Sequence, residues 1–177
     1  MIDLDFILVQ LIGAIGYTLL AISFYRKNKL QILFMQIIAN IFFTVHYFLL
    51  NGITGAISNV IGLVSYTAIY VFDHFKMGKQ KNIMAVLMIV LLLIFTCYNY
   101  TNIYSTLPFV AFIFTITSFL NGKENNIRMF GIVSATCWLI YAIVYKSYVA
   151  IVFEVITLLA TIGSLIKNPN KKEEIHE

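Results

Sequence analysis

The chain has 177 residues, of which 60% are apolar or aromatic, only 11% are charged, and the net charge is +4. An average soluble domain has roughly one-quarter charged residues, and a chain this short has too little interior to bury so much apolar surface. The composition therefore excludes an ordinary soluble fold, and we interpret the positive charge as a membrane-topology signal and not as a nucleic-acid signal.

Seven apolar runs are long enough to cross a hydrocarbon core of about 30 Å, which takes roughly 17–25 helical residues. In chain order the predicted helices cover residues 5–25, 30–50, 53–72, 82–99, 103–120, 127–145 and 148–166. Asp3 and Asp5 precede the first run in place of the basic residues of a signal peptide, so we expect this helix to be retained. The connections are too short for a second domain. We expect a single all-α membrane domain over residues 1–177, with a charged tail at 167–177.

The basic residues predict how this domain is oriented. Seven crossings place alternate connections on opposite sides, and all but one of the twelve Lys and Arg residues then fall together, with Lys146 alone on the other side. Cytoplasmic loops are enriched in Lys and Arg. The N-terminus is therefore predicted to be outside and the C-terminus in the cytoplasm.

An internal repeat appears when the chain is shifted on itself by 95 residues. This shift aligns the first three predicted helices (5–72) with the last three (103–166), and it pairs Phe43 with Trp138, His46 with Tyr141, and Asn59 with Glu154. A three-helix unit followed by one linking helix starts again from the same side of the membrane. We therefore expect a 3+1+3 arrangement of two parallel bundles joined by a lipid-facing helix at 82–99.

Glu154 is the one carboxyl expected inside the membrane, about six residues into the seventh helix. Such a group is costly in lipid and by default marks a solute pathway or a proton relay. The alternative is a structural Glu that is hydrogen-bonded to a neighbouring helix. Asn59 is expected at the same depth in the other half, while Asn40 either joins the site or holds helices together.

Four further residues are expected near this level: Phe43, His46, Trp138 and Tyr141. Trp138 is a candidate for stacking on a flat ligand, and His46 is interpreted as either a hydrogen-bonding residue or a proton carrier. The six tyrosines near helix ends are interpreted as membrane-edge anchors; they are Tyr47, Tyr98, Tyr100, Tyr104, Tyr145 and Tyr148.

Enzyme signatures are missing from the sequence, which contains no HExxH, GxSxG, P-loop or paired carboxylates. Cys97 and Cys137 lie in apolar runs and are interpreted as small buried side chains. We therefore expect a protein that is not an enzyme and has no cofactor and no metal site.

The stretch from Gly13 to His46-Tyr47-Phe48, together with Trp138 followed sixteen residues later by Glu154, resembles the YgjV-like bacterial inner-membrane family over nearly the whole chain. That family is similar in layout to the SWEET and PQ-loop transporters, whose substrates bind near the interface of parallel repeats. The resemblance implies a multi-pass protein of the bacterial inner membrane. The chain departs from that layout in having no Pro-Gln pair and only Pro108 within a helix, so glycines would have to serve as hinges.

The function expected from these features is transport of a small polar solute, sugar-like or vitamin- or nucleoside-like, by facilitated diffusion or proton coupling. The predicted substrate-binding residues are Asn59, Glu154, Trp138, Phe43, His46, Tyr141 and Asn40. The alternative is a non-transporting membrane scaffold or sensor. Expected partners are the lipid bilayer and a small-molecule solute, with a homo-oligomer left open and nucleic acid excluded.

The orientation is testable with tags. A tag at the C-terminus should be cytoplasmic and a tag inserted beside Asn102 should be external, because the basic residues mark the cytoplasmic side. Protease digestion of each tag in intact cells and in inverted vesicles measures this. Two tags protected on the same side would contradict seven crossings.

Overall fold

The structure is a computed structural model that describes residues 4–24, 29–121 and 124–167. Within these ranges the chain is all-α, with seven α-helices and one short 3-10 helix. Their bounds are α1 (Leu4–Phe24), α2 (Lys29–Leu49), α3 (Ile53–His74), α4 (Gly78–Tyr98), η1 (Ile103–Thr106), α5 (Leu107–Asn121), α6 (Glu124–Val144) and α7 (Tyr148–Lys167).

These helices correspond to the seven predicted runs and differ from them mainly in two places. Helix α4 begins at Gly78 and not at residue 82. Its first turn is polar and so lies outside the apolar run on which the prediction was based. In that turn Lys81 pairs with Asp73 of α3 at 2.8 Å. The run predicted at 103–120 opens with η1, whose preceding residue Asn102 accepts hydrogen bonds from the N–H groups of Tyr104 and Ser105. Pro108 follows in the first turn of α5, where its missing N–H leaves no helical bond unmade.

Four described segments are long and apolar enough to cross a membrane: Asp5–Ser23, Ile53–His74, Gly78–Tyr98 and Ile103–Leu120. The described apolar parts of the other three helices, Leu33–Leu49, Met129–Val144 and Tyr148–Gly163, are shorter. Seven helices of this kind are consistent with a membrane protein that crosses the bilayer several times.

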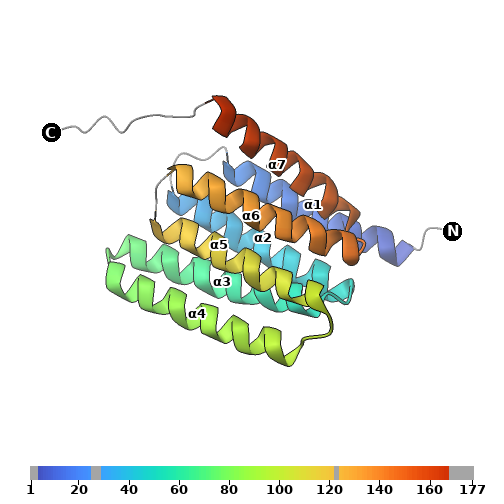
Figure 1. Cartoon of the computed structure of the whole chain (residues 1–177), viewed down its shortest axis with the longest axis horizontal. Helices are drawn as coiled ribbons and strands as arrows, with labels where there is room; N and C mark the ends of the chain where they lie inside the picture. The colour runs from blue at the N-terminus through green and yellow to red at the C-terminus, as the bar shows by residue number, and fades with distance from the viewer. Residues whose placement is uncertain (1–3, 25–28, 122–123, 168–177) are drawn as a thin grey trace.

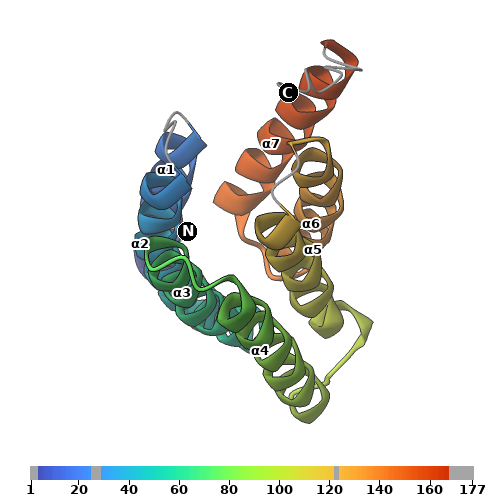
Figure 2. The same cartoon turned by 90° about the vertical axis from the view of Figure 1, so that its left-hand side faces the viewer.

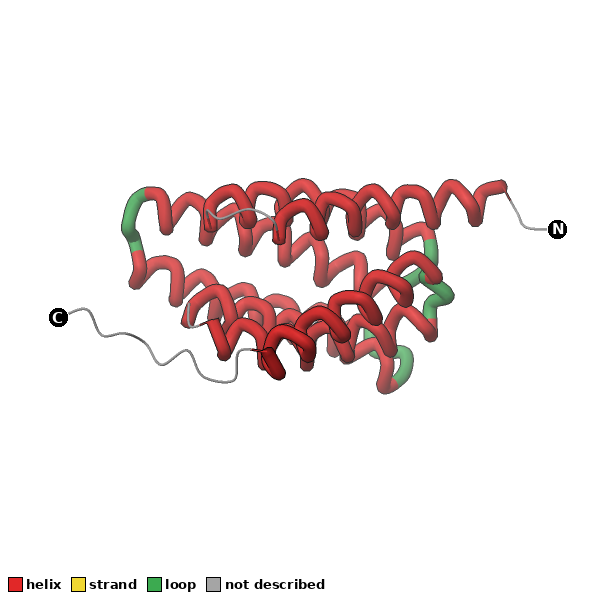
Figure 3. The backbone as a smooth tube through the Cα atoms, turned by 90° about the horizontal axis from the view of Figure 1, so that it is seen from above, coloured by secondary structure: helices red, strands yellow, loops and turns green. Residues whose placement is uncertain are grey.

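The helices run from end to end of the bundle, and successive helices run in opposite directions (Figure 1). Their connections gather at the two ends (Figure 3). Viewed along the helices, α1, α2 and α3 form one arm, called here the first half, and α5, α6 and α7 form the other, the second half (Figure 2). Helix α2 packs between α1 and α3, α6 packs between α5 and α7, and the halves meet where α1 contacts α7 and α3 contacts α5.

Helix α4 lies on the outside of this arrangement, against α3 and α5. Its buried residues are Ala85, Leu92 and Thr96, and most of its remaining apolar side chains are exposed. Such a surface is suited to lipid. Helix α4 also carries Cys97, which is exposed, so the expectation that both cysteines are buried is correct for Cys137 and wrong for Cys97.

Candidate functional site

Glu154 lies buried on α7 and points toward the first half. The Tyr17 hydroxyl of α1 donates a hydrogen bond to Glu154 Oε1 at 3.3 Å, which is long for an O–H···O bond. This contact joins α1 to α7 through two residues that are 137 positions apart in sequence. The intramembrane carboxyl singled out from the sequence therefore lies at the boundary between the two halves.

Tyr47 of α2 is the second hydroxyl beside this carboxyl. Its hydroxyl lies within interaction range of Glu154, Tyr17 and Ser147, but among the described residues its buried oxygen makes no hydrogen bond of acceptable geometry. The side chain is 1% exposed. Its interpretation as a membrane-edge anchor was therefore wrong, because Tyr47 packs inward from α2 against α6.

Aromatic rings from both halves surround these polar groups. Tyr17 stacks on Phe153 at a centroid distance of 5.1 Å and packs on Phe43 at 4.6 Å. Tyr47 stacks on the half-buried Trp138 at 5.4 Å and meets the edge of Tyr141 at 5.3 Å. We call this group the aromatic–carboxyl cluster; its members are Tyr17, Phe43, Tyr47, Trp138, Tyr141, Phe153 and Glu154.

His46 is completely buried and uses both of its ring nitrogens. Nδ1 lies 2.8 Å from the carbonyl oxygen of Val9 on α1, and Nε2 lies 2.6 Å from the hydroxyl of Ser147, the residue before α7. A carbonyl can only accept, so Nδ1 carries a hydrogen, and in the neutral ring Nε2 accepts from Ser147. This geometry corresponds to the hydrogen-bonding interpretation of His46.

Tyr141 makes the reciprocal contact from the second half. Its hydroxyl accepts a hydrogen bond from the N–H of Gly55 at 2.8 Å and bonds the hydroxyl of Thr54 at 3.1 Å. Gly55 is in the first turn of α3, where backbone N–H groups have no partner within the helix. Tyr141 of α6 thus satisfies the start of α3, just as His46 of α2 holds the start of α7.

Gln10 of α1 adds a third contact of this kind. Its side chain donates to the carbonyl of Lys146 and accepts from the N–H of Val149, both at 3.2 Å. All these contacts lie at the end of the bundle where α1, α3 and α7 begin, at the right of Figure 1. We call them the clamp, formed by Gln10, His46, Thr54, Gly55, Tyr141, Ser147 and Val149.

Two glycines make room for the clamp aromatics. A Cβ atom on Gly13 would lie 2.8 Å from the His46 ring, and one on Gly55 would lie 2.5 Å from the Tyr141 ring. Both distances are well inside van der Waals contact. The Gly13 and His46 pair on which the family resemblance rests is thus a direct packing contact between α1 and α2.

The two predicted amides make local contacts. Asn59 donates its side-chain N–H to the carbonyl of Gly55 on its own helix at 2.9 Å, and Asn40 donates likewise to Gln36 at 2.7 Å. Asn40 Oδ1 also packs closely on Gly62 of α3. In the described part of the chain no hydrogen bond joins Asn59 to Glu154, so the facing amide and carboxyl expected from the repeat are not in contact.

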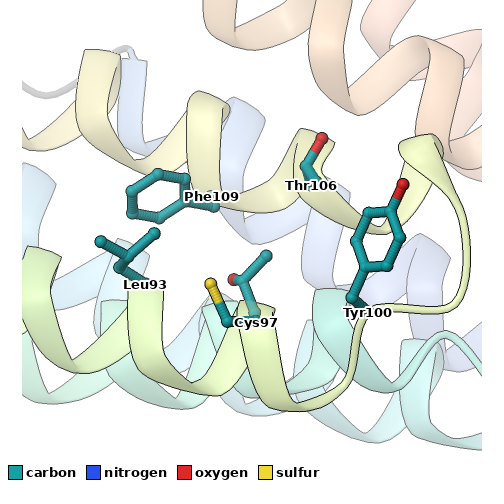
Figure 4. A pocket seen from close by; sticks show the side chains of 6 residues that line it. Leu93, Cys97, Tyr100, Thr106 and Phe109 are labelled. Carbon is teal, nitrogen blue, oxygen red and sulfur yellow. The ribbon is translucent and has the colours of Figure 1, made fainter.

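Two described cavities lie elsewhere on the molecule. One, of about 470 Å³, lies where the end of α4 meets η1 and α5 (Figure 4) and is lined by Leu93, Thr96, Cys97, Tyr100, Thr106 and Phe109. The other, of about 420 Å³, is an apolar groove between α2, α3 and α4. Neither contains a charged side chain or a member of the cluster, so the cluster is the stronger candidate site.

Sequence reasoning missed Tyr17, Tyr47, Ser147 and Gln10. The sequence offers a weak signal for Tyr17, which follows Gly13 and Gly16 on the same face of one helix. Tyr47 resembles the other helix-end tyrosines in sequence, and Ser147 lies in the short connection between the last two predicted helices, which contains no functional motif.

Alanine at Gly55 should destabilise the fold, since overpacking against the Tyr141 ring typically costs about 1–3 kcal/mol. Gly131 of α6 has open space around its Cβ position, so Gly131→Ala should be neutral or stabilising by about 0.5–1 kcal/mol. Unfolding of both variants in detergent gives the comparison. Equal effects at the two positions would show that the Tyr141 contact is absent.

Phenylalanine at Tyr47 should leave stability unchanged or raise it by about 1 kcal/mol, because it removes a buried hydroxyl that has no partner. The same substitution at Tyr141 should cost about 1–3 kcal/mol, because it leaves the Gly55 N–H unpaired. The two midpoints of unfolding, compared with the parent protein, separate these cases. A loss at Tyr47 as large as that at Tyr141 would mean that the Tyr47 hydroxyl is bonded.

Comparison with known proteins identifies the family of the chain. A sequence model of the Imp-YgjV family, described as bacterial inner membrane protein, matches residues 7–172. No curated protein and no solved structure matches the chain. The matched region includes all of the clamp and the whole aromatic–carboxyl cluster, and the apolar helices agree with a multi-pass location. The chain belongs to this family of bacterial inner membrane proteins.

Proposed function

We propose that the protein transports a small polar solute through a site at the aromatic–carboxyl cluster. The observation that carries this proposal is the buried contact between Tyr17 of α1 and Glu154 of α7, which spans the two halves. Ionisable residues within membrane helices that face the protein interior are characteristic of solute and proton pathways. Either facilitated diffusion or proton coupling through Glu154 is compatible with this arrangement.

The transporter proposal includes a SWEET-like architecture, in which two parallel three-helix repeats are joined by α4. Three features support it. The middle helix of each half packs between its neighbours, and α4 is lipid-facing outside both halves. The reciprocal clamp residues His46 and Tyr141 are also the two positions that the shift of 95 residues pairs.

The position of the clamp supports an assignment of the side of the membrane to which this conformation is closed. By the basic-residue rule, the clamp end carries the lone external Lys146 and faces outward. The described hydrogen bonds between the halves lie toward that end, whereas α1 and α7 stand apart at the opposite end (Figure 2). We propose that this is a state closed to the outside, and that solute exchange requires the clamp to open.

A catalytic role is a weaker alternative. His46 and Ser147 form a pair of the type found in serine hydrolases, with Nε2 and the hydroxyl 2.6 Å apart. Both residues are 0% exposed. A nucleophile so placed has no access to a substrate, so we assign this pair to the clamp.

Opening of the clamp can be measured without a known solute. In a background of Cys97→Ser and Cys137→Ala, a reporter Thr157→Cys places a thiol one turn from Glu154, on the cytoplasmic side of the cluster. A membrane-impermeant thiol reagent should label it from the cytoplasmic face. Adding Gln10→Ala removes two clamp hydrogen bonds and should raise labelling from the outer face roughly tenfold, because about 1.4 kcal/mol corresponds to a factor of ten.

Val155→Cys is the matched control, since Val155 lies beside Glu154 on α7 but is exposed on the outer surface. Its labelling should be low from both sides and unchanged by Gln10→Ala. If the Thr157→Cys thiol is not labelled from either side, both with intact Gln10 and in the Gln10→Ala variant, the result would contradict transport and would fit the scaffold alternative.

A further inference from the structure

The polar groups of the cluster have more acceptor capacity than their described partners use. An ionised carboxylate offers about four acceptor positions. Glu154 receives one long hydrogen bond, from Tyr17 at 3.3 Å. The Tyr47 oxygen beside it is buried and makes no hydrogen bond. A ligand that binds an ionised Glu154 must therefore bring hydrogen-bond donors, whereas the Tyr47 hydroxyl can donate or accept.

The cluster also has a carboxyl but no cation. Buried charges in proteins are normally paired, because an unpaired charge in a low-dielectric interior is strongly unfavourable. Among the described side chains no Lys or Arg pairs with Glu154: Lys81 pairs with Asp73, and Lys146 is exposed. The buried base His46 of α2 has both of its ring nitrogens held, by Val9 and Ser147.

The surrounding rings suit a cation better than a neutral solute. Tyr17, which bonds the carboxyl, packs on Phe43 and Phe153, and Trp138 is stacked on Tyr47. Aromatic faces attract ammonium groups, with an effect of about 2 kcal/mol or more when the cation is desolvated. A sugar or nucleoside would use the rings but would offer no counter-charge to an ionised Glu154.

We propose that the solute carries a protonated amine, whose N–H groups bind Glu154 and the Tyr47 oxygen between the aromatic rings. This inference rests on the proposed transport function and names the chemical class of its solute. Because Glu154 also accepts a hydrogen bond from Tyr17, the ammonium binds at a contact between α1 and α7.

The test compares probes of similar size that differ in one group, an ammonium in one and a neutral hydroxyl in the other. The thermal unfolding midpoint of the purified full-length protein is measured with ethanolamine and with ethylene glycol, which replaces the ammonium with a neutral hydroxyl. Ionic strength is matched with sodium chloride. Ethanolamine should raise the midpoint, because a ligand that binds only the folded state stabilises it, and ethylene glycol should not.

Choline separates hydrogen bonding from cation–π attraction, since its quaternary nitrogen has no N–H. It should give a smaller shift than ethanolamine. A shift from choline equal to or larger than that from ethanolamine would overturn the proposed hydrogen bonds to Glu154 and Tyr47.

Variants locate the effect. Glu154→Gln keeps the size and a hydrogen-bonding group but removes the charge, and it should abolish the ethanolamine shift. Tyr47→Phe should reduce the shift without destabilising the unliganded protein, which keeps the test valid if Glu154→Gln folds poorly. Asp5→Asn, which removes a carboxyl at the start of α1, is the matched control and should leave the shift unchanged.

Three results would overturn the inference: no shift with ethanolamine, a shift that persists in Glu154→Gln, or stabilisation by neutral sugars or nucleosides in place of amines. None of these touches the transport proposal, which stands or falls with the two-sided labelling of Thr157→Cys. A neutral ligand combined with clamp-dependent labelling would leave a transporter of a different solute.

Discussion

Polar groups surrounded by hydrocarbon must find partners within the protein, and the rest of this structure depends on where the chain supplies them. The first turns of α3 and α7 each contain backbone N–H groups with no partner in their own helix. Tyr141 satisfies the Gly55 N–H from the opposite half, and Gln10 satisfies the Val149 N–H in the same way. Satisfying these helix starts therefore holds the two halves together.

This arrangement explains several otherwise isolated features of the sequence. The rings of His46 and Tyr141 reach across only because Gly13 and Gly55 leave space for them. His46 cannot be exchanged for an apolar residue without leaving the Ser147 hydroxyl unpaired. The individual bonds are modest, since hydrogen bonds between membrane helices average about 0.6 kcal/mol in one well-studied case. A clamp of several such bonds is strong enough to hold one state and weak enough to open.

The cluster next to the clamp is less completely satisfied. Tyr47 carries a buried hydroxyl with no hydrogen bond, and Glu154 has a single long one. Native proteins leave few buried polar groups unpaired, and those that remain call for an explanation such as a ligand or a functional role. Here the unsatisfied groups lie between halves that the clamp keeps together. Under the proposed function, ligand binding and clamp opening would therefore act on the same helices, α1 and α7.

Helix α4 follows a different rule, because apart from the pair between Lys81 and Asp73 it is held mainly by apolar contacts, and few of its residues are buried. Leu92 and Ala85 anchor it to the core formed with α3 and α5. These apolar contacts of Leu92 and Ala85 fix the position of α4 without directional bonds.

The sequence by itself determined the number of helices, their approximate ends and the membrane environment. It could do so because helical hydrogen bonds are local and the length of an apolar run is visible in the chain. It also identified Glu154 and His46, since a lone ionisable side chain in an apolar run stands out without any structure.

Only the tertiary structure decided which side chains face one another. In a helix that is apolar on all sides, periodicity does not mark the inward face, so Tyr47 was indistinguishable from tyrosines at the membrane edge. Packing against α6 turned it inward, and packing of α1 on α7 brought Tyr17 to Glu154. Asn59 was expected opposite Glu154 from sequence position, yet its amide bonds the carbonyl one turn back, because that partner is always within reach on its own helix.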